Sequence, residues 1–223
     1  MANWTATGTN VLAPLTLSTA QNAVPAGAGQ SALINSSLNS MYHDVGLELS
    51  GAFTLSYYVY DDGVAADRGY AEARAYTGAG YNDGTLQQLY AGGIYSSVTM
   101  PGEVFNATVY QGRFSSGTAP GWFNLDATGV PGRSVGWHRF DIVRQADGTT
   151  VTWYVDGVLG RSFTGVTNAS IDSLRIGSVG AGTSVYAMYL DGIGLSNVPE
   201  PSTWALLGLG ILGLAGRRLY RRH

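Results

Sequence analysis

The chain of 223 residues contains no cysteine and no lysine, and only 12% of its residues carry a charge. The absence of cysteine excludes disulfide bonds, thiolate catalysis and zinc sites built on cysteine. All 12 basic residues are arginine, and four of them fall within the last seven positions. Residues 1–198 therefore hold 8 arginines against 14 acidic residues, a net charge of −6. This charge argues against a nucleic-acid partner, because binding to phosphates needs basic patches.

Side chains suited to hydrolytic catalysis are also scarce. Glycoside hydrolases need a pair of carboxylates, but the chain has four glutamates, at positions 48, 72, 103 and 200. The histidines are three, and no G-x-S-x-G motif accompanies them. His138 fits a strand pattern as a structural residue, and His43 is a metal or base candidate. We therefore predict that the protein is not an enzyme, with a divergent polysaccharide hydrolase or lyase as the alternative.

What the chain does have is glycine, tyrosine and alternating strand patterns. There are 32 glycines and 14 tyrosines. Residues 53–60 and 70–76 alternate between two faces, and so do the segments between Gly136 and Ser196. Asp-Gly pairs, typical of tight turns, follow many of these segments. No stretch from Leu47 to Asn197 has helical amphipathicity, so the sequence predicts an all-β antiparallel sandwich or barrel.

The last third of this region carries a resemblance to a known family. The segments are "GWHRFDIVR", "TTVTWYVDGVL", "SIDSLRIGS" and "YAMYLDGIGLS". Together they resemble the second half of a concanavalin A-like or laminin-G-like jelly roll. The resemblance implies an antiparallel jelly-roll sandwich, which we place at residues 1–197, with residues 1–45 the least defined part. It implies nothing specific about function.

One predicted strand face combines aromatic and charged side chains, as sugar-binding sites do. Tyr70, Glu72, Arg74 and Tyr76 share a face of their strand, and Trp122 lies in a later aromatic segment. We predict that these five residues bind a ligand. The alternative interpretation is ordinary packing, with Glu72 and Arg74 forming an ion pair on the sheet surface.

Calcium is the cofactor that the sequence leaves open. Jelly rolls of the resembled type often hold calcium with loop carboxylates, and calcium prefers six to eight oxygen ligands. Asp61, Asp62 and Asp67 cluster in "YDDGVAADRG" and are the candidate ligands. Turn formation explains Asp62 equally well, because Gly63 follows it.

The C-terminal segment differs from everything before it. Residues 204–216 form a run of 13 residues without charge, preceded by Pro-Glu-Pro and followed by arginines. As a helix, this run would extend roughly 20 Å, less than the hydrocarbon thickness of a bilayer. It therefore predicts a short transmembrane helix that inserts transiently, with the arginines in the cytoplasm and the main domain outside.

This segment closely resembles the PEP-CTERM sorting signal. The resemblance covers Val198–Arg222 and rests on Pro199, Glu200, Pro201, Arg217 and Arg218. It implies export in a Gram-negative bacterium that makes exopolysaccharide. It further implies processing by an exosortase, a membrane-embedded transpeptidase that recognises Pro-Glu-Pro and leaves the product in the envelope or outside the cell. No secretory signal peptide opens this chain, so we expect the true N-terminus to lie upstream.

These observations together predict a surface-sorted envelope or matrix protein with a non-catalytic role. That role is carbohydrate binding, or a structural part in exopolysaccharide and biofilm. A protein-binding adhesin module is a further alternative to the hydrolase or lyase.

Overall fold

The computed structural model describes residues 4–7, 16–21, 29–34, 40–49, 51–64, 68–78, 80–95, 100, 103–115, 121–165, 170–177 and 188–197. These residues form fourteen strands in two antiparallel sheets and contain no helix. The all-β jelly-roll sandwich predicted from the sequence is therefore confirmed. The predicted helix at 204–216 lies outside the described residues, and within them no helix has the length and apolarity needed to cross a membrane.

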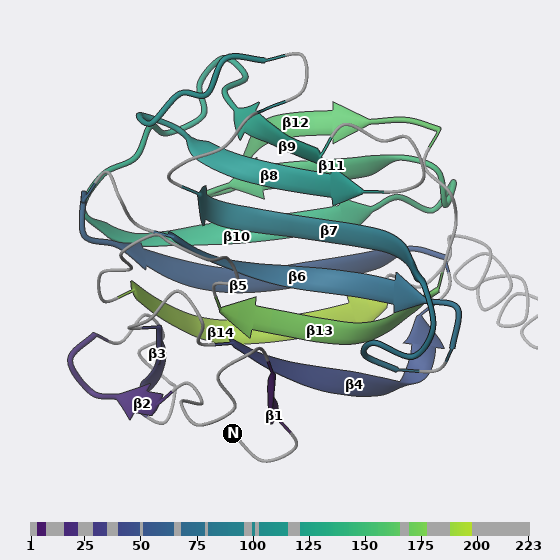
Figure 1. Ribbon diagram of the computed structural model, residues 1–223. Coiled ribbons are helices and arrows are strands. Elements are labelled where there is room, and N and C mark those ends of the chain that lie inside the picture. The colour runs from purple at the N-terminus through teal and green to yellow at the C-terminus, as the bar shows by residue number, and fades with distance from the viewer. Residues whose placement is uncertain are drawn as a thin grey trace, which may run out of the picture.

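The front sheet in Figure 1 has seven strands. In spatial order these are β1 (Thr5–Thr7), β4 (Ser40–Leu49), β13 (Ile171–Gly177), β6 (Arg68–Tyr76), β7 (Leu86–Tyr95), β8 (Tyr110–Ser115) and β9 (Gly121–Leu125).

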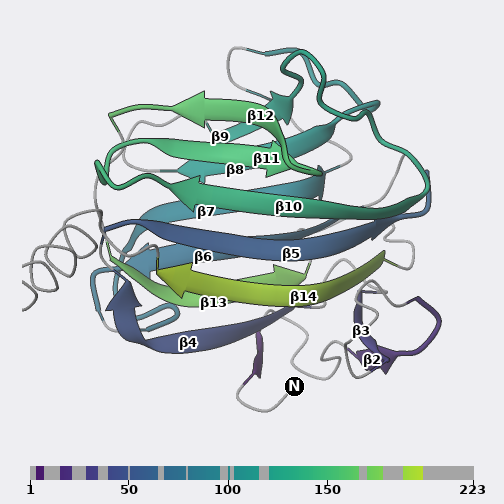
Figure 2. The same ribbon diagram turned by 180° about the vertical axis from the view of Figure 1, so that it is seen from behind.

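The back sheet, which faces the viewer in Figure 2, also has seven strands. Its spatial order is β12 (Val158–Phe163), β11 (Val151–Val155), β10 (Gly136–Arg144), β5 (Phe53–Asp61), β14 (Met188–Asn197), β3 (Ser31–Ile34) and β2 (Thr16–Ser18).

The two-residue alternation of the sequence decides which side chains enter the space between the sheets. In β5 every second residue from Phe53 to Asp61 is buried, and the residues between them are partly exposed. In β6 the three alanines at positions 71, 73 and 75 belong to the main core cluster. Their neighbours Glu72 and Arg74 therefore lie on the opposite, outer surface of the front sheet.

Aromatic side chains fill the core and connect the sheets. Trp153 on β11 is 1% exposed and contacts Phe123 edge-to-face at a centroid distance of 5.0 Å. Its indole N–H donates to the carbonyl oxygen of Ala91 on β7 at 2.9 Å. The Tyr57 hydroxyl on β5 donates to the next carbonyl, that of Gly92, at 2.7 Å. Two side chains of the back sheet thus form hydrogen bonds to the middle of one strand of the front sheet, β7.

Asp-Gly pairs form turns in some places and a bulge in another. Asp156 and Gly157 join β11 to β12 with φ angles of 50° and 79°, as a two-residue hairpin turn requires. Asp191 and Gly192 do not form a hairpin turn, because they lie inside β14. The register with β5 shifts between Asp191 and Gly194, so this pair forms a bulge instead.

Replacing Gly112 by alanine should destabilise the sandwich. A Cβ atom at this position would lie 2.3 Å from a ring carbon of Phe123, which is buried in the core. Overpacking of this kind costs about 1–3 kcal/mol. Gly194→Ala is the matched control, because a Cβ there meets nothing within 4 Å. Urea unfolding should show a lowered midpoint for Gly112→Ala alone, and equal midpoints would contradict the packing described.

Candidate ligand-binding face

The outer surface of the front sheet carries one continuous row of side chains across six strands. The strand registers place one residue of each strand side by side, from β4 through β13, β6, β7 and β8 to β9. We call this set the cross-strand row; its members are Tyr42, Arg175, Glu72, Ala91, Arg113 and Trp122.

Glu72 is the centre of this row, and three arginines surround it. Its side chain is 1% exposed. Arg74 donates to Oε2 through Nε at 2.8 Å and Nη2 at 2.6 Å. Arg175 donates to the same oxygen through Nη1 at 3.1 Å. Nη1 of Arg113 lies 4.0 Å from Oε1. One carboxylate is therefore shared by three guanidinium groups.

The electrostatic balance keeps Glu72 ionised. Burial by itself would raise the pKa of Glu72, but the positive charges of Arg74, Arg175 and Arg113 outweigh it. The pKa of Glu72 consequently lies below the ordinary value of 4.5. Burial likewise opposes the charge of Arg74, and the carboxylate of Glu72 reverses this and raises the pKa of Arg74. A carboxylate held in this way is a poor proton donor at neutral pH.

Aromatic rings flank the charged centre at the β9 end of the row. Trp122 stacks on Tyr95 at 4.2 Å and meets Tyr70 edge-on at 5.1 Å. The guanidinium carbon of Arg113 lies 5.6 Å from the centroid of the Trp122 ring. Tyr70 and Trp122 belong to a second hydrophobic cluster, separate from the main core, that includes Met100.

A loop covers the other end of the row. The β6–β7 loop folds over the ends of β13 and β4 (Figure 1), and the backbone N–H of Tyr81 donates to Asp44 Oδ1 at 2.8 Å. The Tyr81 ring stacks on Tyr42 at 4.4 Å and lies 5.4 Å from the guanidinium carbon of Arg74. Arg74 also donates to the Tyr76 hydroxyl at 2.7 Å.

The five residues predicted from the sequence lie on this one face, but they are buried. Tyr70, Glu72, Arg74, Tyr76 and Trp122 are each at most 9% exposed. The ion pair between Glu72 and Arg74 is present, so the packing interpretation describes their contacts correctly. Ligand binding by these residues stays a prediction.

The sequence interpretation missed Arg113 and Arg175. Each lies inside a strand, and Arg175 stands between the core residues Leu174 and Ile176. An arginine in the middle of an apolar strand was the available signal. Its partner could not be read from the sequence, because Glu72 is 103 positions away.

The predicted calcium ligands have other partners where they are described. Asp61 is fully buried and accepts two hydrogen bonds from Arg133, from Nε at 2.9 Å and Nη2 at 2.8 Å. Asp62 accepts from the backbone N–H of Val64 at 2.8 Å. Asp67 lies outside the described residues, which hold no group of three or more metal-ligating side chains. A calcium ion at Asp61 would compete with a guanidinium, and the site stays a prediction.

His138 lies between a serine and an aspartate, with one ring nitrogen facing each of them. Its Nδ1 is 2.8 Å from Oδ2 of Asp156, and its Nε2 is 3.2 Å from Oγ of Ser134. The same Nε2 lies 3.0 Å from the backbone carbonyl oxygen of Ser134. Both ring nitrogens therefore face acceptor oxygens. Through these contacts His138 joins β10 to the Asp156 turn, and its structural role stays a prediction.

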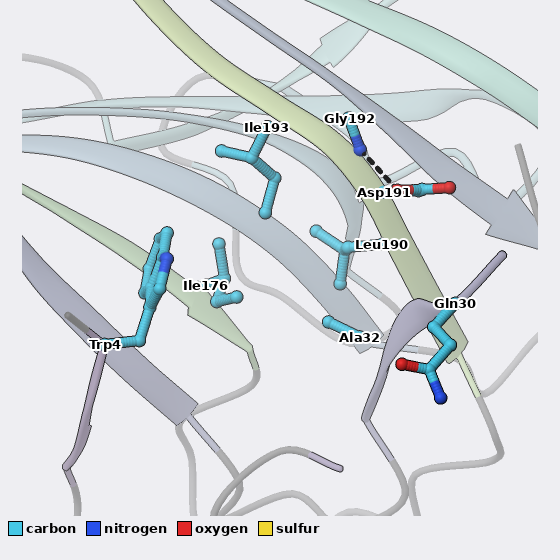
Figure 3. Close-up of a pocket in the computed structure, with 8 residues that line it drawn as sticks. All are labelled: Trp4, Gln30, Ala32, Ile176, Leu190, Asp191, Gly192 and Ile193. Carbon is cyan, nitrogen blue, oxygen red and sulfur yellow. Dashed lines mark hydrogen bonds between the residues drawn. The ribbon is translucent and has the colours of Figure 1, made fainter. Parts of the chain in front are cut away.

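A hollow opens between the sheets near the N-terminal strands (Figure 3). It has a volume of about 200 Å³, smaller than typical small-molecule pockets. The backbone N–H of Gly192 donates to Asp191 Oδ1 at 2.7 Å beside it. The lining residues come from strands distant in sequence and are Trp4, Gln30, Ala32, Ile176, Leu190, Asp191, Gly192 and Ile193. Its mostly apolar lining offers few groups for recognition.

Comparison with known protein families gives a match to the family described as PEP-CTERM protein-sorting motif, over residues 197–222. The chain carries a PEP-CTERM motif. This motif implies an exported protein that is anchored in the membrane and then processed. Pro199, Glu200, Pro201, Arg217 and Arg218 lie within the matched segment and outside the described residues.

Solved structures show the same fold at low sequence identity. A carbohydrate esterase from the Shiga toxin-encoding bacteriophage phi24B is 14% identical, with a TM-score of 0.52 over 87% of this chain and 90% of that chain. The binding domain of Paraclostridial Mosquitocidal Protein 1 is 12% identical, with a TM-score of 0.51 over 86% of this chain. A sialidase is 10% identical, with a TM-score of 0.50 over 88% of this chain.

This chain spans 45% of the mosquitocidal protein structure and 17% of the sialidase. At these identities the likeness concerns the fold. No curated protein matches the chain significantly.

Replacing Glu72 by glutamine should destabilise the protein by about 3–5 kcal/mol, because buried guanidinium groups lose their counter-charge. Since the pKa of Glu72 is lowered on folding, its stabilisation is present above the unfolded pKa of about 4.3. That stabilisation is lost as the pH falls through the lower, folded pKa. Urea unfolding of the wild-type protein and of Glu72→Gln, measured from neutral to acidic pH, checks this. The difference between their free energies of unfolding should shrink below about pH 4.

Asp126→Asn is the control for this experiment. Asp126 is exposed and lies 3.4 Å from Arg161, so its loss should cost less than about 1 kcal/mol. Equal effects of the two substitutions at neutral pH would contradict the role given to Glu72.

Proposed function

We propose that the protein is an envelope or extracellular-matrix component that an exosortase sorts and that binds carbohydrate of the exopolysaccharide or biofilm. The PEP-CTERM motif supports the sorting. In this proposal residues 1–197 are the ectodomain and residues 198–223 the sorting signal, whose run at 204–216 spans the membrane transiently. The exosortase recognises the segment from Pro199 to Pro201.

The cross-strand row is the observation that carries the binding part of the proposal. It combines guanidinium groups, a carboxylate and an indole on one sheet face, the groups that hydrogen-bond to sugar hydroxyls and stack on sugar rings. Protein recognition by an adhesin module would not require this combination.

The role is non-catalytic. The row contains a single carboxylate, whereas hydrolysis of a glycosidic bond uses two. The lowered pKa of Glu72 also removes it as a general acid near neutral pH. Release of shortened fragments from a bound polysaccharide would favour the hydrolase or lyase alternative over this proposal.

Sorting is tested by replacing Pro199, Glu200 and Pro201 together with alanine in the source organism. We expect the variant to accumulate as an unprocessed, membrane-associated precursor, because the exosortase no longer recognises the substituted segment. His223→Ala is the control. Position 223 lies outside the matched segment, so this variant should be processed normally. Intact-mass measurement of surface protein gives the readout, and an uncleaved tail in the mature wild-type protein would refute the processing.

Binding is tested with the purified full-length chain and the polysaccharide of its own source. Trp122→Ala should weaken binding by about tenfold, a loss of ~1.4 kcal/mol typical of an aromatic anchor. Trp137→Ala is the control, since Trp137 packs against Tyr60 on the back sheet. Thermal melting confirms that both variants are folded.

The same titration is run with calcium and with a chelator. Dependence on calcium would support the site at Asp61, Asp62 and Asp67. Loss of binding in Trp137→Ala alone would move the site to the back sheet, and no binding by the wild-type chain would refute the carbohydrate role.

A further inference from the structure

We infer that the cross-strand row binds an acidic sugar and that Arg175, together with Arg113, holds the carboxylate of that sugar. This inference rests on the proposed carbohydrate-binding function and adds the chemical class of the ligand.

Arg175 has an unused hydrogen-bonding edge. Its side chain is 5% exposed and donates to Glu72 through Nη1 alone. Its Nε and Nη2 are buried and have no hydrogen-bond partner among the residues that the structure describes. These two nitrogens form the planar edge of a guanidinium that matches the two oxygens of a carboxylate. Buried donors without partners are costly, so this edge calls for an acceptor.

The same edge binds carboxylates elsewhere in this protein. Arg74 uses Nε and Nη2 to hold Glu72, and Arg133 uses Nε and Nη2 to hold Asp61. In both pairs the N–O distances lie between 2.6 and 2.9 Å. In the described part of the chain, no carboxylate lies on the equivalent pair of donors of Arg175.

Arg113 and Glu72 complete a pattern that fits an acidic sugar. Within the described ranges, neither Nε of Arg113 nor Oε1 of Glu72 has a hydrogen-bond partner. The Arg113 side chain is 34% exposed, so a ligand can approach the cluster from solvent on its side. A sugar carboxylate supplies acceptors for the arginines, and an adjacent hydroxyl supplies a donor for Glu72.

Local charge favours the same ligand class. Arg74, Arg113 and Arg175 against Glu72 give the cluster a net charge of +2, whereas the whole chain carries −3. The Trp122 ring lies beside Arg113 and adds an aromatic group to the edge of this cluster. A neutral sugar would leave this excess positive charge without a counter-charge.

The test compares polygalacturonate with its carboxyl-reduced form, using the full-length chain at low ionic strength. Binding of the acidic polymer should be at least about tenfold tighter, and added salt should weaken it. Arg175→Gln should lower the affinity for the acidic polymer by about tenfold or more. Arg139→Gln should leave it unchanged, because Arg139 is exposed on the back sheet and pairs with Asp141.

Arg113→Gln keeps the test decisive if Arg175→Gln does not fold. Arg113 is partly exposed, so this variant should fold and bind the acidic polymer more weakly. Equal affinity for the acidic and reduced polymers, or unchanged affinity in a folded variant at Arg113 or Arg175, overturns this inference. That result leaves the proposed function standing if the source polysaccharide still binds, whereas failure of every polysaccharide to bind overturns both.

Discussion

Two hydrogen bonds across the core determine where the outer face of the front sheet lies. Trp153 and Tyr57 reach from the back sheet and donate to adjacent carbonyl groups of β7, those of Ala91 and Gly92. Ala91 is also a member of the cross-strand row on the outer surface. These bonds hold β7 against the back sheet, and the ladders of β7 with β6 and β8 place Glu72 and Arg113 beside Ala91.

The second constraint is the burial of charge on that face. A carboxylate with 1% exposure is stable only with close counter-charges, and Glu72 has three arginines within reach. They bring more hydrogen-bond donors than one carboxylate can accept. The surplus donors on Arg175 and Arg113 are a consequence of how the chain neutralises Glu72. The face is well packed, but some of its buried hydrogen-bond donors have no acceptor among the described residues.

The sequence predicts the strands of this fold better than it predicts which side chains contact one another. Alternation in β5 and β6 identifies core and outer residues, because the pattern within a strand is local. The charge partners are non-local: Arg175 is 103 positions from Glu72, and Arg133 is 72 from Asp61. Those contacts depend on strand order and register, which alternation does not encode. This is why the sequence around Asp61 does not indicate that Arg133 is its partner.

The end of β14 limits how the domain can be presented at a surface. Asn197, its last residue, still pairs with Phe53 of β5 and is also the first residue of the PEP-CTERM motif. Pro199 follows two positions later, so Val198 alone separates the last paired residue from the Pro-Glu-Pro segment. If the protein is attached through this segment, a linker of one residue gives the domain little reach away from its attachment point.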